Sequence, residues 1–167
     1  RKITFLLSLL LAFVTTTALA QIDTNKEYRV KDMGTGYYMI AGDYEAHAGG
    51  PTGGVKFVEK TESDDQVFTV EAEGTGYKLK TKSGKYIYCQ PWNVDALDQA
   101  SVLTFRDNGD GTYYIMNGSK YFKVEEVGGV YYPFCDAPAT AAAKFAFEEV
   151  TSEPTVDPEV PATSFEV

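Results

Sequence analysis

Short runs of alternating apolar and polar residues recur through positions 21–150, and this pattern predicts β-strands. The runs are rich in aromatic and β-branched residues, which favour a pleated, half-buried surface. Turn sequences containing glycine separate them, and Asn-Gly and Asp-Gly pairs suit hairpin turns in which both central residues have positive φ. The clearest runs are Val67–Val70, Tyr86–Tyr88 and Tyr113–Met116, with turns at Gly74–Gly76, Ser83-Gly84, Asp107–Gly111 and Asn117-Gly118. Strands this short are not stable as isolated hairpins, so we expect them to join a larger sheet or barrel.

The alternation is copied three times along the chain. Self-similarity at a period of tens of residues indicates one supersecondary unit, each copy of which needs its neighbours to bury its apolar face. Residues two apart on a strand face the same way, so each copy offers a matched inward set. Four sets of positions superpose: Val30, Leu79 and Ile115; Tyr38, Tyr86 and Tyr121; Phe68, Leu103 and Phe145; Val70, Phe105 and Phe147. Units that close around one axis leave no unpaired sheet edge, so the sequence predicts a closed all-β body.

This frame resembles the β-trefoil superfamily over essentially all of 21–150. Residues 28–38 look like the opening of a ricin-type lectin repeat, and Gln66-Val67-Phe68 is similar to the Gln-x-Trp signature of such repeats, with Phe in place of Trp. Residues 107–115 and 117–121 instead resemble the fascin-type pattern. The resemblance implies a β-trefoil of three pseudo-equivalent repeats, with twelve strands, six closing a barrel and six forming a triangular hairpin cap. Function on so widely reused a fold has to be argued from a site.

Two flanking segments lack the repeat. Residues 1–20 combine basic Arg1-Lys2, an apolar stretch and the small-residue site Ala18-Leu19-Ala20, which predicts a signal peptide cleaved before Gln21. Its apolar run is shorter than the roughly 18 residues of a membrane span. We therefore expect a secreted, periplasmic or cell-surface protein with no membrane insertion after cleavage. Residues 151–167 form an acidic Pro-rich tail, a linker or the start of a following domain.

The net charge bears on the class of binding partner, and the cysteine content bears on disulfide formation. The formal net charge of −9 becomes −11 once Arg1 and Lys2 are removed, and an acidic surface disfavours nucleic acid, whose binding needs Lys and Arg contacts to phosphate. Cys89 and Cys135 are the two cysteines. Export permits a disulfide between them, but spacing alone leaves the bridge and two free thiols equally open.

Enzyme chemistry finds little support in the sequence. Cysteine nucleophiles need a base within reach, and the sole histidine, His47, lies far along the chain from both cysteines. The acidic pairs Asp64-Asp65 and Asp107 with Asp110 occupy turns, where Asp is expected for local hydrogen bonding. We predict a non-enzyme with no catalytic residues, no metal site and no cofactor.

Candidate ligand-binding residues lie where the copies diverge, after the second strand of each. An exposed indole or phenol ring offers a flat face to the C–H side of a sugar, while amide and carboxylate groups bind its hydroxyls. The predicted ligand-binding residues are Tyr44 in the first loop, Trp92, Asn93 and Asp95 in the second, and Tyr132 in the third. The alternative for Trp92 is that it packs over the barrel mouth. At the places where ricin-type lectins carry a sugar-binding Asp, the resemblance aligns Ile40, Tyr88 and Lys123, none of them a carboxylate.

Together these features predict a secreted, non-catalytic recognition module, appended to a larger exported protein, that binds a glycan or polysaccharide. A protein-binding or structural trefoil, of the inhibitor or fascin kind and without a glycan ligand, is the alternative.

Overall fold

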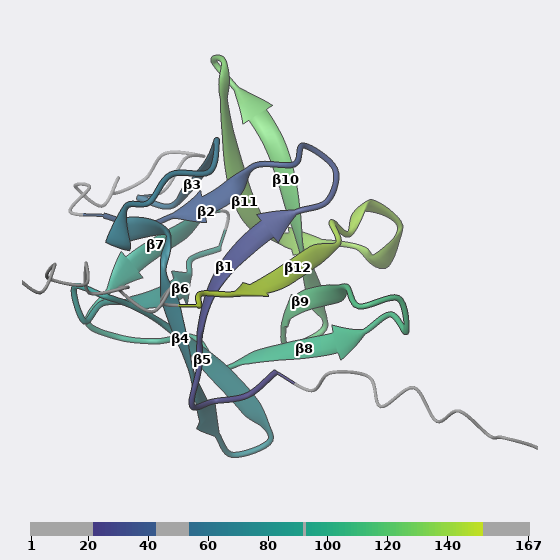
Figure 1. The fold of residues 1–167 in the computed structure, drawn as a ribbon. Helices are drawn as coiled ribbons and strands as arrows, with labels where there is room; N and C mark the ends of the chain where they lie inside the picture. The colour runs from purple at the N-terminus through teal and green to yellow at the C-terminus, as the bar shows by residue number, and fades with distance from the viewer. Residues whose placement is uncertain (1–21, 43–53, 92, 152–167) are drawn as a thin grey trace, which may run out of the picture.

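The computed structural model describes residues 22–42, 54–91 and 93–151 (Figure 1). Twelve β-strands and two short 3-10 turns make up the regular structure of this part of the chain. The turns are η1 (Asp64–Gln66) and η2 (Ala139–Ala141). The second turn lies in an Ala-rich segment, whose composition alone would favour a helix.

Six strands close into a barrel: β1 (Glu27–Asp32), β4 (Phe68–Glu73), β5 (Gly76–Thr81), β8 (Leu103–Asp107), β9 (Tyr113–Asn117) and β12 (Phe145–Glu149). Each pairs antiparallel with two others, in the cyclic order β1-β4-β5-β8-β9-β12 and back to β1. A ring of this kind has no free edge.

The other six strands pair as three hairpins: β2 (Tyr38–Ile40) with β3 (Lys56–Val58), β6 (Tyr86–Cys89) with β7 (Val94–Leu97), and β10 (Lys120–Val127) with β11 (Val130–Ala137). The third is the longest and extends well beyond the body in Figure 1. This barrel with three hairpins is the arrangement that the resemblance implies.

The pairing register repeats three times and confirms the superposition made from sequence. The predicted core positions face one another across neighbouring strands, as Val30 with Phe147, Leu79 with Val70 and Ile115 with Phe105. Each superposed tyrosine pairs with the residue that follows the first core position of its copy. These pairs are Tyr38 with Lys31, Tyr86 with Lys80, and Tyr121 with Met116. The three copies are therefore equivalent in backbone pairing as well as in composition.

The barrel interior is filled by these equivalent apolar residues. Val30, Leu79 and Ile115 are fully buried, and so are Phe68, Leu103 and Phe145. Burying an aliphatic or aromatic side chain stabilises a fold by roughly 1.5–3 kcal/mol. The members of each set are equally buried, so all three copies contribute to one core.

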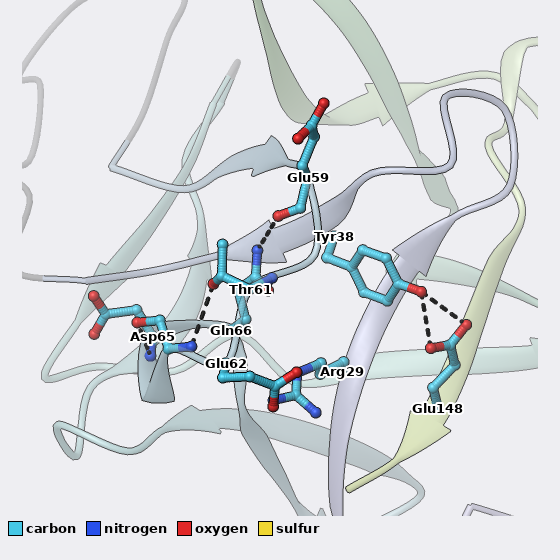
Figure 2. Close-up of polar contacts among 9 residues, drawn as sticks. Arg29, Tyr38, Glu59, Thr61, Glu62, Asp65, Gln66 and Glu148 are labelled. Atoms are coloured by element: carbon cyan, nitrogen blue, oxygen red, sulfur yellow. Dashed lines mark hydrogen bonds and ion pairs between the residues drawn. The ribbon is translucent and has the colours of Figure 1, made fainter.

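The superposed tyrosines Tyr38, Tyr86 and Tyr121 differ between copies in their hydrogen-bond partners. The hydroxyl of Tyr38 donates to the Glu148 carboxylate at 2.9 Å (Figure 2). Burial and this neighbouring carboxylate raise the pKa of Tyr38, which keeps the hydroxyl a donor. Tyr86 likewise donates to Glu71 at 3.1 Å, but the third copy has an arginine at the acid's place, and Arg106 donates to the Tyr121 hydroxyl at 2.9 Å.

Candidate functional site

The Gln66 signature has a structural role. Gln66 is fully buried between β3 and β4; its Nε2 donates to the Glu59 carbonyl at 2.7 Å, and its Oε1 accepts from the Thr61 amide at 2.7 Å (Figure 2). Both ends of the amide are occupied, which is the usual condition for burying such a group. The side chain clamps the connection after β3 and is not available to a ligand.

Two of the five predicted ligand-binding residues, Tyr44 and Trp92, lie outside the described residues. Asn93 and Asp95 are described, and both are buried, with 4% and 0% of their surface exposed. The sequence places them in an open loop, but strand β7 begins at Val94, so Asp95 belongs to a strand. The turn closes between Gln90 and Asn93 through a 2.9 Å backbone hydrogen bond.

Both oxygens of the Asp95 carboxylate accept hydrogen bonds from groups of the protein itself. Its Oδ1 accepts from the Gly54 amide at 2.5 Å, and its Oδ2 accepts from Gln90 Nε2 at 2.8 Å and Asn93 Nδ2 at 3.4 Å. A buried carboxylate is tolerated when its oxygens are hydrogen-bonded in this way. Asp95 and Asn93 therefore shape the second hairpin, and a ligand would reach them only if that hairpin opened.

The cysteines meet beside this turn as free thiols. Cys135 Sγ donates to the Gln90 carbonyl at 3.3 Å, and the Cys89 thiol hydrogen-bonds the Cys135 sulfur. This hydrogen bond and burial raise the pKa of Cys89 well above its ordinary value. Two strands that are far apart in sequence, β6 and β11, thus bring the thiols together.

Tyr132 lies on strand β11, whereas the sequence places it in a loop. The turn before it is tight, with Gly128 and Gly129 at φ 63° and 83°, and so the strand pairing extends almost to the hairpin tip. Alternation turns Tyr131 inward, where its ring meets the edge of Tyr37 with 5.5 Å between centroids, and turns Tyr132 outward. Tyr132 is half-buried and has no side-chain hydrogen bond or ring contact within the part of the chain that the structure describes.

The same side of the hairpin carries charged groups around the ring of Phe134, which is buried, with 6% of its surface exposed. Cross-strand partners share a face, and the register pairs Glu125 with Tyr132 and Lys123 with Phe134. Lys123 Nζ lies 5.3 Å from the centroid of the Phe134 ring, 3.0 Å from Glu125 Oε1 and 3.9 Å from Asp136 Oδ1. We call Lys123, Glu125, Tyr132, Phe134 and Asp136 the β10–β11 outer face.

This face combines a flat ring with acceptors and a donor. The side chains of Glu125 and Asp136 are about half exposed, at 53% and 49%, while Lys123 is 24% exposed and fixed by its neighbours. Lys123 stands at one of the places where ricin-type lectins carry an acid, so the acceptors are supplied by Glu125 and Asp136 instead. The other two such places hold Ile40, which is buried, and Tyr88, which is half-buried. The sequence signal that could have indicated this surface is the presence of two acids, Glu125 and Asp136, on the two strands of one hairpin.

Two further features, metal-ligand clusters and membrane-spanning helices, can be checked in the described ranges. Residues 22–42, 54–91 and 93–151 contain no group of three or more His, Cys, Asp or Glu side chains placed to hold a metal ion. The same ranges contain no helix long and apolar enough to span a membrane.

Comparison with known proteins identifies the fold. No protein-family model and no curated protein matches the sequence. Among solved structures, the BEL β-trefoil matches with a TM-score of 0.61 and 16% identity over 79% of this chain and 99% of that one. The ricin B-like lectin of Macrolepiota procera, solved with lactose, matches with a TM-score of 0.60 and 11% identity over 78% of this chain and 99% of that one. The fold is a β-trefoil.

A similar fold forms part of a larger enzyme. A GlcNAcα1-4Gal-releasing endo-β-galactosidase from Clostridium perfringens matches with a TM-score of 0.61 and 13% identity, over 75% of this chain but only 33% of that one. At these identities the likeness establishes the fold alone.

Proposed function

We propose that this β-trefoil is a non-catalytic carbohydrate-recognition module that binds glycan through the β10–β11 outer face. The observation that carries the proposal is the outward ring of Tyr132, without a side-chain partner among the described residues, beside the acids Glu125 and Asp136. An apolar platform with a few well-placed polar groups is the general composition of a ligand site.

The chemistry of the face suits a neutral, hydroxylated ligand. A pyranose ring presents C–H groups on one side, which pack against an aromatic ring, and hydroxyls at its rim. Glu125 and Asp136 accept hydrogen bonds from such hydroxyls, and the ammonium of Lys123 donates to them. The acidic net charge of −9 also favours a neutral sugar over a phosphate-rich partner. The lactose complex of the Macrolepiota procera lectin supports the same ligand class for this fold.

The finer parts of the proposal follow from sequence. The leader at 1–20 makes the module extracellular, periplasmic or cell-surface, and the acidic Pro-rich segment 151–167 connects it to a further part of an exported protein. Tyr44 and Trp92 remain predicted ligand contacts, because neither is among the described residues.

The test is a titration of the full chain, labelled with nitrogen-15, with lactose and with N-acetylglucosamine up to tens of millimolar. We expect amide shifts concentrated in β10 and β11. Tyr132→Ala should weaken binding at least tenfold, and Tyr132→Phe should retain it because the ring remains. Val127→Ala is the matched control, since Val127 is an exposed apolar residue of the same hairpin, 38% exposed. Equal binding by Tyr132→Ala and wild type would refute this surface, and no shifts with any sugar would favour the protein-binding alternative.

A further inference from the structure

A cleft of about 440 Å³ lies between the β1–β2 turn and the connection from β11 to β12. It is lined by Asp32 and Met33–Thr35 on one side, and by Val124 and Ala141–Lys144 on the other. No residue of the β10–β11 outer face lines it. Its volume falls within the range of roughly 300–1,000 Å³ that is typical of small-molecule sites.

A buried carboxylate with one unused oxygen lines this cleft. Asp32 is 2% exposed, and its Oδ2 accepts from both the amide and the hydroxyl of Thr35, each at 2.7 Å. The other oxygen, Oδ1, has no hydrogen-bond partner among the residues that the structure describes. Among the described residues, Arg29 Nε is the one buried side-chain polar atom without a hydrogen-bond partner, so Asp32 Oδ1 is still reached by solvent. Because Asp32 lines the cleft, a ligand there can take the place of that solvent as the hydrogen-bond donor to Oδ1.

Gly34 leaves that carboxylate accessible. Its backbone does not lie in the positive-φ region, in contrast to Gly36 at φ 78°, so the conformation does not require glycine. A Cβ at position 34 would lie 3.4 Å from Asp32 Oδ2 and 3.7 Å from Oδ1. Any larger side chain would therefore cover the carboxylate, and glycine keeps this approach open.

The walls of the cleft are fixed and largely apolar. The Met33 amide donates to the Lys144 carbonyl at 2.9 Å, which ties the β1–β2 turn to the opposite wall. Met33 itself is 48% exposed, beside Val124 and the alanines. Lys144 Nζ is 3.0 Å from Asp110 and so is already paired with an acid other than Asp32.

We propose that this cleft is a second saccharide subsite, in which Asp32 Oδ1 accepts a hydrogen bond from a sugar hydroxyl and the C–H side of the ring packs on Met33 and Val124. The ligand is a neutral sugar residue with a free hydroxyl next to an apolar ring face. The inference rests on carbohydrate recognition as the function, but uses none of the side chains of the outer face. One chain would then hold two sugar residues of a glycan at separate points.

The experiment uses the labelled full chain with lactose and with N-acetylglucosamine, and compares Asp32→Asn and Gly34→Leu with wild type. Asn keeps an oxygen for the Thr35 hydrogen bonds but replaces the free acceptor by a donor, and Leu covers it. We expect shifts of the Met33–Thr35 and Ala141–Lys144 amides, weakened at least tenfold in both variants and retained in Tyr132→Ala. Asp23→Asn is the control, because Asp23 forms a similar local turn outside the cleft.

The outcomes separate the two proposals. Shifts confined to β10 and β11 would overturn the cleft and leave the proposed function standing, and shifts at the cleft that persist in both variants would also overturn it. The absence of shifts from every sugar would overturn both proposals. An unchanged pattern of amide peaks away from position 34 shows that each variant is folded.

Discussion

Gly76 marks a point where the barrel leaves no room for a methyl group. It opens strand β5, whose next residue, Tyr77, pairs with Leu103 on β8 and so joins two copies of the repeat. Its φ is not positive, so steric exclusion and not backbone conformation explains the glycine. A Cβ there would lie 2.6 Å from the Leu103 carbonyl oxygen and 2.7 Å from Val102 Cγ1. The oxygen belongs to the backbone of a fully buried residue and cannot move aside.

Gly76→Ala should therefore destabilise the protein. Overpacking a well-packed interior costs about 1–3 kcal/mol, and replacing glycine recovers about 0.4–1 kcal/mol through the unfolded chain. The difference is a net loss of up to about 2.6 kcal/mol in the free energy of unfolding, and because the close contact is with a backbone atom we expect the upper half of that range, about 1.3–2.6 kcal/mol. Gly34→Ala is the matched control, because its Cβ meets nothing closer than 3.4 Å and its backbone is unstrained. It should lie between neutral and about 1 kcal/mol more stable than wild type.

The assay is urea unfolding of both variants and wild type, followed by the near-ultraviolet circular dichroism of the tyrosines. A lower midpoint with an unchanged slope would show a change in stability alone. If Gly76→Ala unfolds at the wild-type midpoint or above, the strands at this junction are not as close as described, and the reasoning fails.

Three further predictions concern titration and burial. Hydrogen bonds, above all the one from the Thr112 hydroxyl, lower the pKa of Asp110 from 3.8 to about 2. The ionised Asp110 therefore stabilises the folded state fully above pH 3.8, and this stabilisation is lost as the pH falls towards 2. Asp110→Asn should flatten the fall in melting temperature across that window, and an unchanged fall would contradict the assignment. Because its pKa is raised, Cys89 should react slowly with iodoacetamide in the native protein at pH 7, and about tenfold faster with each pH unit above that. Mass spectrometry follows the modification. Fast labelling of Cys89 at neutral pH would show that its thiol is not hydrogen-bonded to Cys135. Gln66→Leu should cost about 1–3 kcal/mol in urea unfolding by leaving the amide and carbonyl that it clamps unpaired, and a neutral result would exclude the clamp.

The repeat could be predicted from sequence because its signal is local and is copied. Val30, Leu79 and Ile115 stand out as apolar residues at matching places, and matching places in closed copies must face the same interior. Turn glycines add to the signal, since Gly36, Gly84 and Gly118 all have positive φ in the structure.

The surroundings of the candidate residues were harder to predict because they depend on tertiary contacts and on strand register. Asp95 looks like an exposed loop acid in sequence, and only the fold brings the Gly54 amide and the Gln90 side chain to its oxygens. Tyr132 is a candidate from sequence, but its place on a strand opposite Glu125 follows from a pairing register that periodicity does not specify. The free oxygen of Asp32 has no sequence signature at all, since Asp in the sequence Asp-Met-Gly-Thr-Gly also suits an ordinary turn.

The second cap hairpin is joined to both of its neighbours, by Asp95 to Gly54 after β2 and by the Gln90 carbonyl to Cys135 on β11. Hydrogen bonds thus connect the second cap hairpin to the segment before β3 and to β11. Transplanting a foreign segment at 90–93 would disturb the other two hairpins as well, so efforts to re-target this scaffold should start from the tip at Gly128-Gly129, which lies at the far end of β10 and β11.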